Sequence, residues 1–565
     1  MVQLNQASLQ NVDKVPLWHS TVVILLFILL LAGFLRLYNL GQSPPGLNQD
    51  EASNAWNAYC LLKTGKDQTG VSWPIFYTRG LGGNSSTLFI YYMIPFQALG
   101  GLNIFTTRLP GAVSGIFTVL LIYFVGKRLF NQQVGLMAAF LLALNPWHLQ
   151  QSRWGHEATL AALLGIVPLA MMLWARMPIS DNKDGPPRPV LAALAGAAAG
   201  ICCYGYHAVR IFIPVFLLAI VLLTLPQWWR CIKTRKGALA IAAFIFGFIV
   251  TFGPLAWQHI FHPESISRHS LELKKEGFFL LDAPFGTAVK NVFSRYIHHF
   301  GPDFLFIRGD YSIIQSPPGC GQFHWYMLPI MILGLIFILK SFKSSLSARI
   351  VLALVIAYPV GDCLYLKPSM HSLRSAPGLC SLILLGAAGA VITARWLWSR
   401  SRKLTLAGIT VFVIAVVILN VRYFHRFYVE YNLDPEVCHV FNTDLVEACK
   451  WLKPRLKDTN AVFYTSTYMN MPYVITLVAL GYDPNQWFND PREFFTNGEW
   501  DYYTHYGKMY FIYDESFIPA LALLQRGFLP SRIFFIIRPG ELNLSQPIYR
   551  IVNPDGIASL WICEQ

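Results

Sequence analysis

Two adjacent carboxylates, Asp50 and Glu51, are the side chains of this sequence best placed for acid–base chemistry. They follow the run Ser43-Pro-Pro-Gly-Leu-Asn-Gln49, just after the first long apolar segment. A carboxylate at this position could take a proton from an acceptor beside a membrane-bound substrate. A simpler interpretation is that both acids only stabilise the start of a helix through its dipole.

Other ionisable and aromatic side chains fall between later apolar segments. Arginine and histidine groups are suited to holding a phosphate leaving group. Taken singly, each residue is explained as well by anchoring at the membrane interface. Taken together, they predict one shared polar cavity in which cations hold a phosphate and a carboxylate acts as base. The candidates for substrate or phosphate binding are Arg153, His156, Glu157, Tyr206, His207, Arg210, His371 and Arg374, with Arg268 and Asp310 as further loop contacts.

The elements that must position these residues are apolar helices. The chain has 565 residues, of which 54% are hydrophobic and 13% charged, whereas a soluble protein carries about 25% charged residues. Segments of about 20 apolar residues are long enough to cross a bilayer. The eleven predicted spans are Trp18–Tyr38, Leu109–Phe130, Val134–Leu149, Thr159–Ala175, Val190–Tyr204, Ile211–Leu225, Ala238–Gln258, Trp325–Leu339, Ile350–Leu366, Ser375–Ala394 and Leu404–Val421.

Basic residues predict how these spans are oriented. They are concentrated in one set of connecting loops, which the positive-inside rule places in the cytoplasm together with the N-terminus. Much of the net charge of +14 is then explained by topology and by affinity for anionic lipid headgroups, so that membrane lipids are predicted partners and a nucleic acid is not required. We expect a multi-pass protein of the plasma (inner) membrane.

Three segments are predicted outside the membrane: residues 39–108, residues 259–324 and the tail 422–565. In the first, a helix should run from Asp50 to Gly65 with an apolar stripe and a polar stripe, and it should lie in the membrane interface with Asp50 facing water or a cavity. Ser86–Ala98 is apolar but too short to span and contains Pro95, which indicates a re-entrant or surface-lying helix.

The tail lacks long apolar runs and alternates short strand-like and helix-like patterns. Ala461–Thr465, Lys508–Tyr513 and Arg532–Arg538 are typical of strands, and Asp444–Leu452 is typical of a helix. The sequence therefore predicts a membrane domain over residues 1–421 and an extracytoplasmic α/β domain over residues 422–565. The ten cysteines form no Cys-x-x-Cys motif. Cys438 and Cys449 could pair in the tail.

At the residues that suggest chemistry, the sequence resembles the GT-C glycosyltransferase superfamily. Within it, the sequence is most similar to the protein-mannosyltransferase-like family 39 and to the bacterial lipid A aminoarabinose transferases. The resemblance covers roughly the first 420 residues. It rests on Pro45-Gly-Leu-Asn-Gln-Asp-Glu-Ala52, Leu88-Phe-Ile-Tyr-Tyr92, Gly100, Arg108-Leu-Pro110, Asn145-Pro146, Ser152-Arg153 and Pro368–Arg374.

The resemblance implies an activity and roles for particular residues. A hexose or pentose would pass, with inversion, from a polyprenyl-phosphate carrier to a lipid, protein or glycan acceptor outside the membrane. Asp50 matches the catalytic carboxylate of the family, with Glu51 as its neighbour. Glu157 stands where many members have an aspartate, so its role and the presence of a divalent metal ion are left open; no cofactor is implied with certainty. Contacts to the carrier phosphate are implied for Arg153, His207, Arg210, His371 and Arg374.

Three other classes of protein remain open from the sequence. A polytopic transporter would suit eleven spans, although transporters place ionisable groups near mid-bilayer. A lipid-linked polysaccharide ligase or polymerase would depend on arginine and histidine in a large outer loop and would not need the Asp50–Glu51 pair. A scaffold with an exterior sensing domain is the third alternative.

Overall fold

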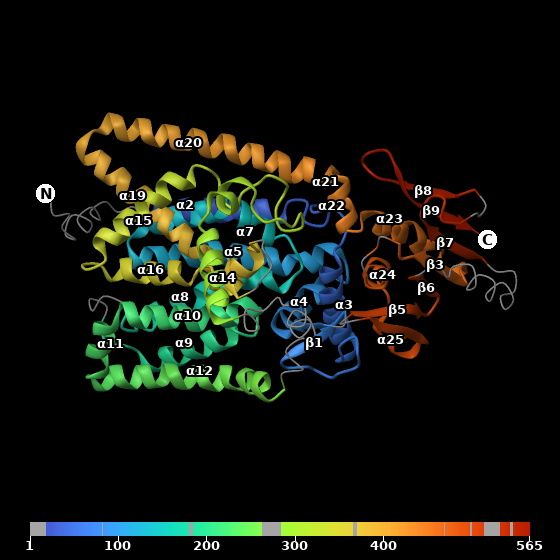
Figure 1. The fold of residues 1–565 in the computed structure, drawn as a ribbon, viewed down its shortest axis with the longest axis horizontal. Helices are drawn as coiled ribbons and strands as arrows, with labels where there is room; N and C mark the ends of the chain where they lie inside the picture. The colour runs from blue at the N-terminus through green and yellow to red at the C-terminus, as the bar shows by residue number, and fades with distance from the viewer. Residues whose placement is uncertain are drawn as a thin grey trace.

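The computed structural model describes residues 18–81, 83–179, 185–262, 284–364, 370–467, 469, 471–497, 500–513, 532–542 and 546–564. A bundle of apolar helices makes up most of the molecule, and a C-terminal domain built on a sheet is joined to one end of it (Figure 1). The predicted fold class, an α-helical membrane protein with a C-terminal α/β domain, is confirmed.

Each of the eleven predicted spans overlaps a helix of this bundle. The bundle contains α2 (Trp18–Leu37), α5 (Ile104–Leu129), α6 (Gln132–Ala143), α8 (Ala161–Trp174), α9 (Pro189–Cys202), α10 (His207–Leu223), α11 (Leu225–Ile232), α12 (Arg235–Phe261), α15 (Met327–Ser341), α16 (Leu346–Ala357), α19 (Leu379–Arg400) and α20 (Arg402–His425).

The number of membrane crossings is smaller when judged by helix length. Among the described residues, seven helical segments are long and apolar enough to cross a membrane, or eight if α10 and α11, which meet at a bend of 81°, form one span. Helices α6, α9 and α15 have only 12, 14 and 15 residues. At 1.5 Å per residue the longest reaches about 22 Å, against an apolar core of about 30 Å. The count of eleven therefore stays a prediction.

Glycines let two of these helices approach closely. A Cβ atom on Gly196 of α9 would lie 1.9 Å from the carbonyl oxygen of Phe244 in α12, and one on Gly247 of α12 would lie 2.1 Å from the carbonyl oxygen of Ala193. Small residues at such contacts allow backbone-to-backbone packing, which drives association of helices in lipid. Helices α9 and α12 are thereby held as one pair.

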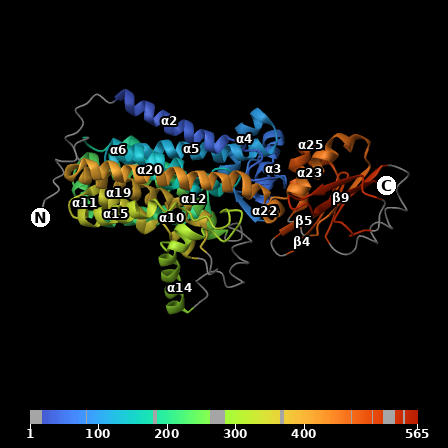
Figure 2. The ribbon, with the colours of Figure 1, turned by 90° about the horizontal axis from the view of Figure 1, so that it is seen from above.

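Short elements connect the long helices of the bundle. The hairpin of β1 (Tyr77–Gly80) and β2 (Gly83–Ser86) leads into α4 (Thr87–Gly100), the helix predicted there. Helix α14 (Phe285–His298) projects away from the bundle (Figure 2). The other short elements are α3 (Gln49–Thr64), α7 (Pro146–Gln151), η1 (Glu157–Leu160), η5 (Asp303–Ile307), α17 (Val360–Cys363), α18 (Ser372–Ser375) and η6 (Ala376–Gly378).

Helix α3 has the predicted start and end but a different environment. Asn48 caps it, and Gly65 ends it at φ 70°. Of its polar stripe, Asp50 is half-buried, whereas Asn54 and Asn57 are buried. The helix is enclosed because it lies between the bundle and the C-terminal domain (Figure 2).

The C-terminal domain has a mixed sheet. Within the described residues the strand order is β4-β5-β6-β3-β7-β9-β8, and β3 is parallel to both of its neighbours. Strand β3 is buried along its whole length, as a central parallel strand requires. The strands are β3 (Ala461–Thr465), β4 (Arg492–Asn497), β5 (Trp500–Tyr506), β6 (Met509–Ile512), β7 (Ile533–Ile537), β8 (Tyr549–Val552) and β9 (Ala558–Glu564).

Helices complete this domain. The predicted helix is α23, and the three predicted strands are β3, β6 and β7. All ten cysteines lie in the described residues and are free, Cys438 and Cys449 included. Helix α20 runs past the predicted domain boundary at residue 421, so that boundary stays a prediction. The further helices are η7 (Arg426–Glu430), α21 (Tyr431–Leu433), α22 (Pro435–Val440), α23 (Thr443–Leu452), α24 (Pro472–Leu480) and α25 (Pro484–Asn489).

Candidate active site

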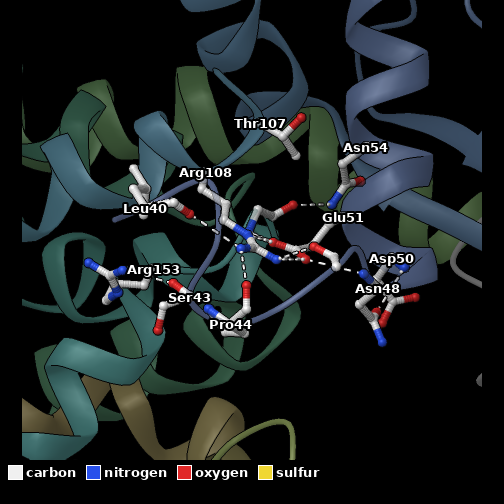
Figure 3. Close-up of polar contacts among 12 residues, drawn as sticks. Leu40, Ser43, Pro44, Asn48, Asp50, Glu51, Asn54, Thr107, Arg108 and Arg153 are labelled. Atoms are coloured by element: carbon white, nitrogen blue, oxygen red, sulfur yellow. Dashed lines mark hydrogen bonds and ion pairs between the residues drawn. The ribbon is translucent and has the colours of Figure 1, made fainter. Parts of the chain in front are cut away.

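Glu51 is enclosed in an ion pair at the start of α3 (Figure 3). Its side chain is fully buried, and Arg108 donates to it from Nε to Oε1 at 2.8 Å and from Nη2 to Oε2 at 2.9 Å. The backbone N–H groups of Gly155 and Asn48 donate to the same carboxylate at 2.8 and 3.2 Å. Four donors thus satisfy the carboxylate. Through them Glu51 joins α3 to α5 and to the loop between α7 and η1.

Arg108 also fixes the turn that precedes α3. Its Nη1 donates to the carbonyl oxygens of Leu40 and Pro44 at 3.3 and 2.7 Å, and its Nη2 donates to that of Gly46 at 3.0 Å. A guanidinium can donate five hydrogen bonds in a fixed plane, and these contacts with Glu51 occupy all its nitrogens. Sequence reasoning included Arg108 only in the resemblance and missed this role.

Asp50 lies outside this ion pair. It is half-buried, and its backbone N–H donates to Oδ1 of Asn48 at 3.0 Å. Figure 3 shows its side chain on the side of α3 away from Arg108. The two neighbouring acids therefore occupy different environments, and only Glu51 is bound to the buried arginine.

The loop between α7 and η1 meets α3 at Asn54. Nδ2 of Asn54 donates to the Gly155 carbonyl oxygen at 3.3 Å and to Oε2 of Glu157 at 3.2 Å. Asn54 is one helical turn after Asp50, and residues four apart are neighbours on a helix. The structure thus brings Glu157 to the first turns of α3. Nε2 of His156 lies 3.6 Å from Oε2 of Glu157.

Histidines and arginines from three loops converge next to Glu157. The Tyr206 ring lies 4.1 Å from the His207 ring and 6.1 Å from the His156 ring. The charges of four further groups act on His207, and α18 packs against both η1 and α10. These four groups are His156, Arg210, His371 and Arg374.

Arg210 is oriented by two partners at the start of α10. Its Nε donates to the Cys203 carbonyl oxygen at 2.9 Å, and its Nη1 lies 3.0 Å from Nε2 of His259. These contacts hold the guanidinium near His207. Arg210 is therefore positioned in the cationic cluster formed by His156, His207, Arg210, His371 and Arg374.

A buried aspartate that sequence reasoning missed organises this cluster. Asp362 lies 2.8 Å from Nη2 of Arg295, 3.1 Å from Nε2 of His299 and 3.5 Å from Nη1 of Arg374. It also accepts the backbone N–H of His371 at 3.0 Å. The available signal was an acid inside the predicted span Ile350–Leu366, because a charge in such a run needs partners.

Asp310 holds the other side of the same loop. Its Oδ2 accepts the backbone N–H of Ser372 at 2.6 Å and lies 3.5 Å from Nδ1 of His371. Burial lowers the pKa of His371, the Asp310 charge opposes that shift, and the Arg374 charge adds to it. Asp310 therefore holds the loop that bears His371 in place.

Arg153 lies apart from the cationic cluster. It is fully buried, its Nη1 donates to the carbonyl oxygens of Leu35 and Arg36 at 3.0 Å, and its Nη2 donates to that of Ser43 at 2.8 Å. Its guanidinium also packs on the rings of Phe427 and Tyr428. These contacts hold the end of α2 against the end of α20.

Two predictions from the sequence concern Arg268 and a divalent metal ion. Arg268 lies outside the described residues. Among the described residues, no group of three or more histidine, cysteine, aspartate or glutamate side chains could hold a metal ion.

Comparison with known proteins supports the resemblance found in the sequence. The sequence profile described as dolichyl-phosphate-mannose-protein mannosyltransferase matches residues 85–257. One similar structure is that of ArnT from Cupriavidus metallidurans bound to undecaprenyl phosphate. The similarity covers 96% of this chain and 98% of the ArnT chain, with 12% sequence identity and a TM-score of 0.52. The apo structure of ArnT is 13% identical to this chain, with a TM-score of 0.52. No curated protein sequence matches.

A second structural neighbour is larger than this chain. The oligosaccharyltransferase of Archaeoglobus fulgidus is 11% identical, with a TM-score of 0.47. The similarity covers 82% of this chain but only 63% of the archaeal one, so the chain spans less than two thirds of that protein.

The profile and the fold confirm the resemblance to GT-C superfamily glycosyltransferases. The helical bundle with its C-terminal sheet domain has the fold of ArnT. Together with the apolar helices, these findings support a multi-pass membrane glycosyltransferase. The donor, the acceptor and the roles of single residues are matters for proposal.

Proposed function

We propose that this protein transfers a sugar from a polyprenyl-phosphate carrier to an acceptor on the extracytoplasmic side, with inversion and with Asp50 as general base. The observation that carries the proposal is the contact between Glu157 and Asn54, one helical turn after Asp50, together with the histidines and arginines from three loops beside Glu157. A base next to a cationic cluster is the arrangement that sugar transfer from a phosphate requires.

The cationic cluster would hold the carrier phosphate. His207, Arg210, His371 and Arg374 supply donors and positive charge on one side, and charge-assisted hydrogen bonds of this kind suit phosphate oxygens. A lipid phosphate as carrier is supported by ArnT, which is similar in fold and binds undecaprenyl phosphate. Because Asp362 and Asp310 fix the loop that bears His371, the cluster is formed before substrate arrives.

The reaction then follows from these positions. The acceptor hydroxyl or amine gives its proton to Asp50 and attacks the anomeric carbon from the side opposite the phosphate. The bond between that carbon and the phosphate oxygen breaks, and the lipid phosphate departs with the electron pair, stabilised by the cationic cluster. Asn54 and Glu157 would orient the acceptor beside Asp50. In this proposal Glu51 and Arg153 position the backbone and do not touch substrate.

The test is Asp50→Asn in purified protein supplied with radiolabelled polyprenyl-phosphate sugars. We expect sugar transfer and donor hydrolysis to fall by about 10²–10⁴-fold, the usual contribution of a general base, with the thermal midpoint unchanged. The matched control is Asp303→Asn, because Asp303 is also an outer-loop acid, but exposed and paired with Arg308.

Near-wild-type transfer by Asp50→Asn would refute the role of Asp50. A wild-type protein that yields neither labelled product nor hydrolysed donor would favour a transporter or a scaffold instead. A product longer than one added sugar would favour a polymerase.

A further inference from the structure

A separate cavity of about 290 Å³ lies at the end of α20. It is formed where the last helix of the bundle meets the loop after η5 and the start of α7. None of the residues of the candidate active site lines it. The lining of this cavity, the α20 cavity, consists of Pro146, Phe306, Ile307, Gly319, Cys320, Gly321, Phe323, His324, Trp325, Leu419, Arg422, Tyr423 and Arg426.

Two arginines give the α20 cavity its charge. Arg422 and Arg426 are one helical turn apart, a spacing at which like charges repel each other. Both line the cavity together with Cys320. Burial raises the pKa of the Cys320 thiol, and the charge of each arginine lowers it. Among the described residues that line the cavity, no side chain is acidic. The carboxylate of Glu430 lies 3.9 Å from Nε of Arg426 but is largely exposed to solvent.

The loop opposite is shaped to accept a guanidinium. Gly319 has φ +67°, and a Cβ atom there would lie 3.5 Å from Nη2 of Arg426. The loop backbone thus lies directly against the charged group. Burial lowers the pKa of His324 to about 4, so this lining residue is neutral at physiological pH. The two arginines are then the charged groups of the lining.

The rest of the α20 cavity is apolar and opens toward an apolar surface. The rings of Phe306 and Trp325 stack at 5.5 Å, and about half of the Trp325 and Ile307 side chains remains exposed. Aromatic and basic side chains together are typical of the level of lipid headgroups. Helices α15 and α20 continue from here with exposed apolar side chains, namely Ile332, Leu333, Leu335, Ile336, Leu339, Ile409, Val413, Ile414, Val417, Ile418 and Val421.

We propose that the α20 cavity binds the phosphate headgroup of an anionic membrane lipid, with Arg422 and Arg426 on the phosphate and the acyl or prenyl chain along α15 and α20. Charge and surface agree on this ligand: two cations meet the phosphate, and the helices offer an apolar path for its chain. The site is distinct from the one proposed for the sugar carrier.

The cavity is also connected to the framework of the bundle. The hydroxyl of its lining residue Tyr423 donates to the Pro146 carbonyl oxygen at 3.2 Å, and the Tyr423 ring stacks on Phe427, on which Arg153 packs. A lipid bound here would therefore brace the junction of α7 and α20. We expect it to raise the thermal midpoint of the protein.

The test is native mass spectrometry of the full-length protein in mixed micelles, titrated with phosphatidylglycerol or phosphatidylcholine. Arg422→Gln/Arg426→Gln should weaken phosphatidylglycerol binding about thirtyfold, or about fivefold for each arginine, and should leave phosphatidylcholine binding unchanged. Leu419→Trp keeps both charges but fills the cavity, and it should also weaken phosphatidylglycerol binding. The matched control is Arg400→Gln/Arg402→Gln, since these arginines lie between α19 and the start of α20 and pack on Trp396 and Trp398.

Three outcomes would overturn the proposal. The first is equal phosphatidylglycerol binding by the wild type, the Arg422/Arg426 variant and Leu419→Trp. The second is an equal loss in the control variant, which would indicate nonspecific attraction of lipid by charge. The third is a competition experiment in which inorganic phosphate binds at the two arginines as tightly as phosphatidylglycerol does. That result would indicate a site for free phosphate. The thermal midpoint of each variant, measured without lipid, reports whether it is folded.

Discussion

Asp50 and Glu51 show how far two identical functional groups can diverge when they are adjacent. Glu51 is buried and bound by Arg108 and two backbone N–H groups, whereas Asp50 is half-buried one helical turn before Asn54, which contacts Glu157. The first arrangement fixes a helix, and the second leaves a carboxylate near the proposed acceptor position. The two residues should therefore respond differently to the same substitution.

We expect Glu51→Gln to act on stability. Removing one partner of a buried ion pair leaves the other charge uncompensated and costs about 3–5 kcal/mol. The thermal midpoint and the yield of folded protein in detergent should fall, while Asp50→Asn keeps both near the wild-type values. A Glu51→Gln protein as stable as the wild type, but inactive, would assign Glu51 to catalysis instead.

His324 predicts a dependence of stability on pH. In the unfolded chain its pKa is the ordinary 6.5, and burial lowers it to about 4 in the folded protein. Between these values the unfolded state binds the extra proton, so the free energy of unfolding should fall as the pH drops from about 6.5 to about 4. His324→Gln should flatten this part of a plot of thermal midpoint against pH.

The control for that experiment is His298→Gln, because His298 is exposed. It should leave the pH dependence as in the wild type. An unchanged slope in His324→Gln would show that other groups cause the acid sensitivity.

At the residue scale, the sequence indicated which loops hold ionisable side chains but not which of these side chains are buried. Arg153 was expected at the carrier phosphate, yet its partners are backbone carbonyl oxygens of residues 35, 36 and 43, which no sequence pattern reveals. Asp362 was missed because it lies in an apolar run. Burial and partner choice depend on contacts between distant segments, whereas the type and approximate place of a residue do not.

Helices were predictable because their apolar runs are long and contiguous. The strands and the helix predicted for the tail were found for the same reason: their patterns repeat over several residues. The number of crossings was not predictable, since α6, α9 and α15 are shorter than a straight span and their neighbours determine how they sit. The enclosure of α3 also depends on a domain that its own sequence does not indicate.

The pairing of α9 with α12 gives a prediction at the scale of elements. Gly247→Leu would place a side chain against the Ala193 carbonyl oxygen and force the helices apart. Overpacking of this kind costs about 1–3 kcal/mol or more, measured as a lower thermal midpoint in detergent. Gly253→Leu on the same helix is the matched control, because a Cβ atom there has no described atom within 4 Å. Equal effects of the two substitutions would contradict close packing at Gly247.

The whole molecule is organised around α3, which is held from both sides. The bundle binds it through Arg108, and the C-terminal domain binds it through Trp487, whose Nε1 donates to the Gln68 carbonyl oxygen at 2.9 Å and whose ring meets that of Trp56 edge-on at 5.8 Å. The helix that bears Asp50 thus depends on both parts of the chain for its position.

Trp487→Ala should therefore affect the membrane part of the protein. Truncation of a large buried aromatic side chain costs about 3–5 kcal/mol, and here that side chain supports α3. We expect faster proteolysis within residues 39–108 and lower sugar transfer, whereas Trp561→Ala, in β9, should leave both unchanged. Normal transfer by a folded Trp487→Ala protein would show that α3 needs no support from the C-terminal domain.

The double support of α3 has a consequence for inherited or engineered change. A defect that begins in the C-terminal domain, such as a loosened turn or a nick by a protease, would first be noticed as reduced turnover while most of the structure persists. Attempts to trim the protein to its helical bundle, or to exchange its C-terminal domain for that of a relative, would have to rebuild the tryptophan contact before any rate could be compared.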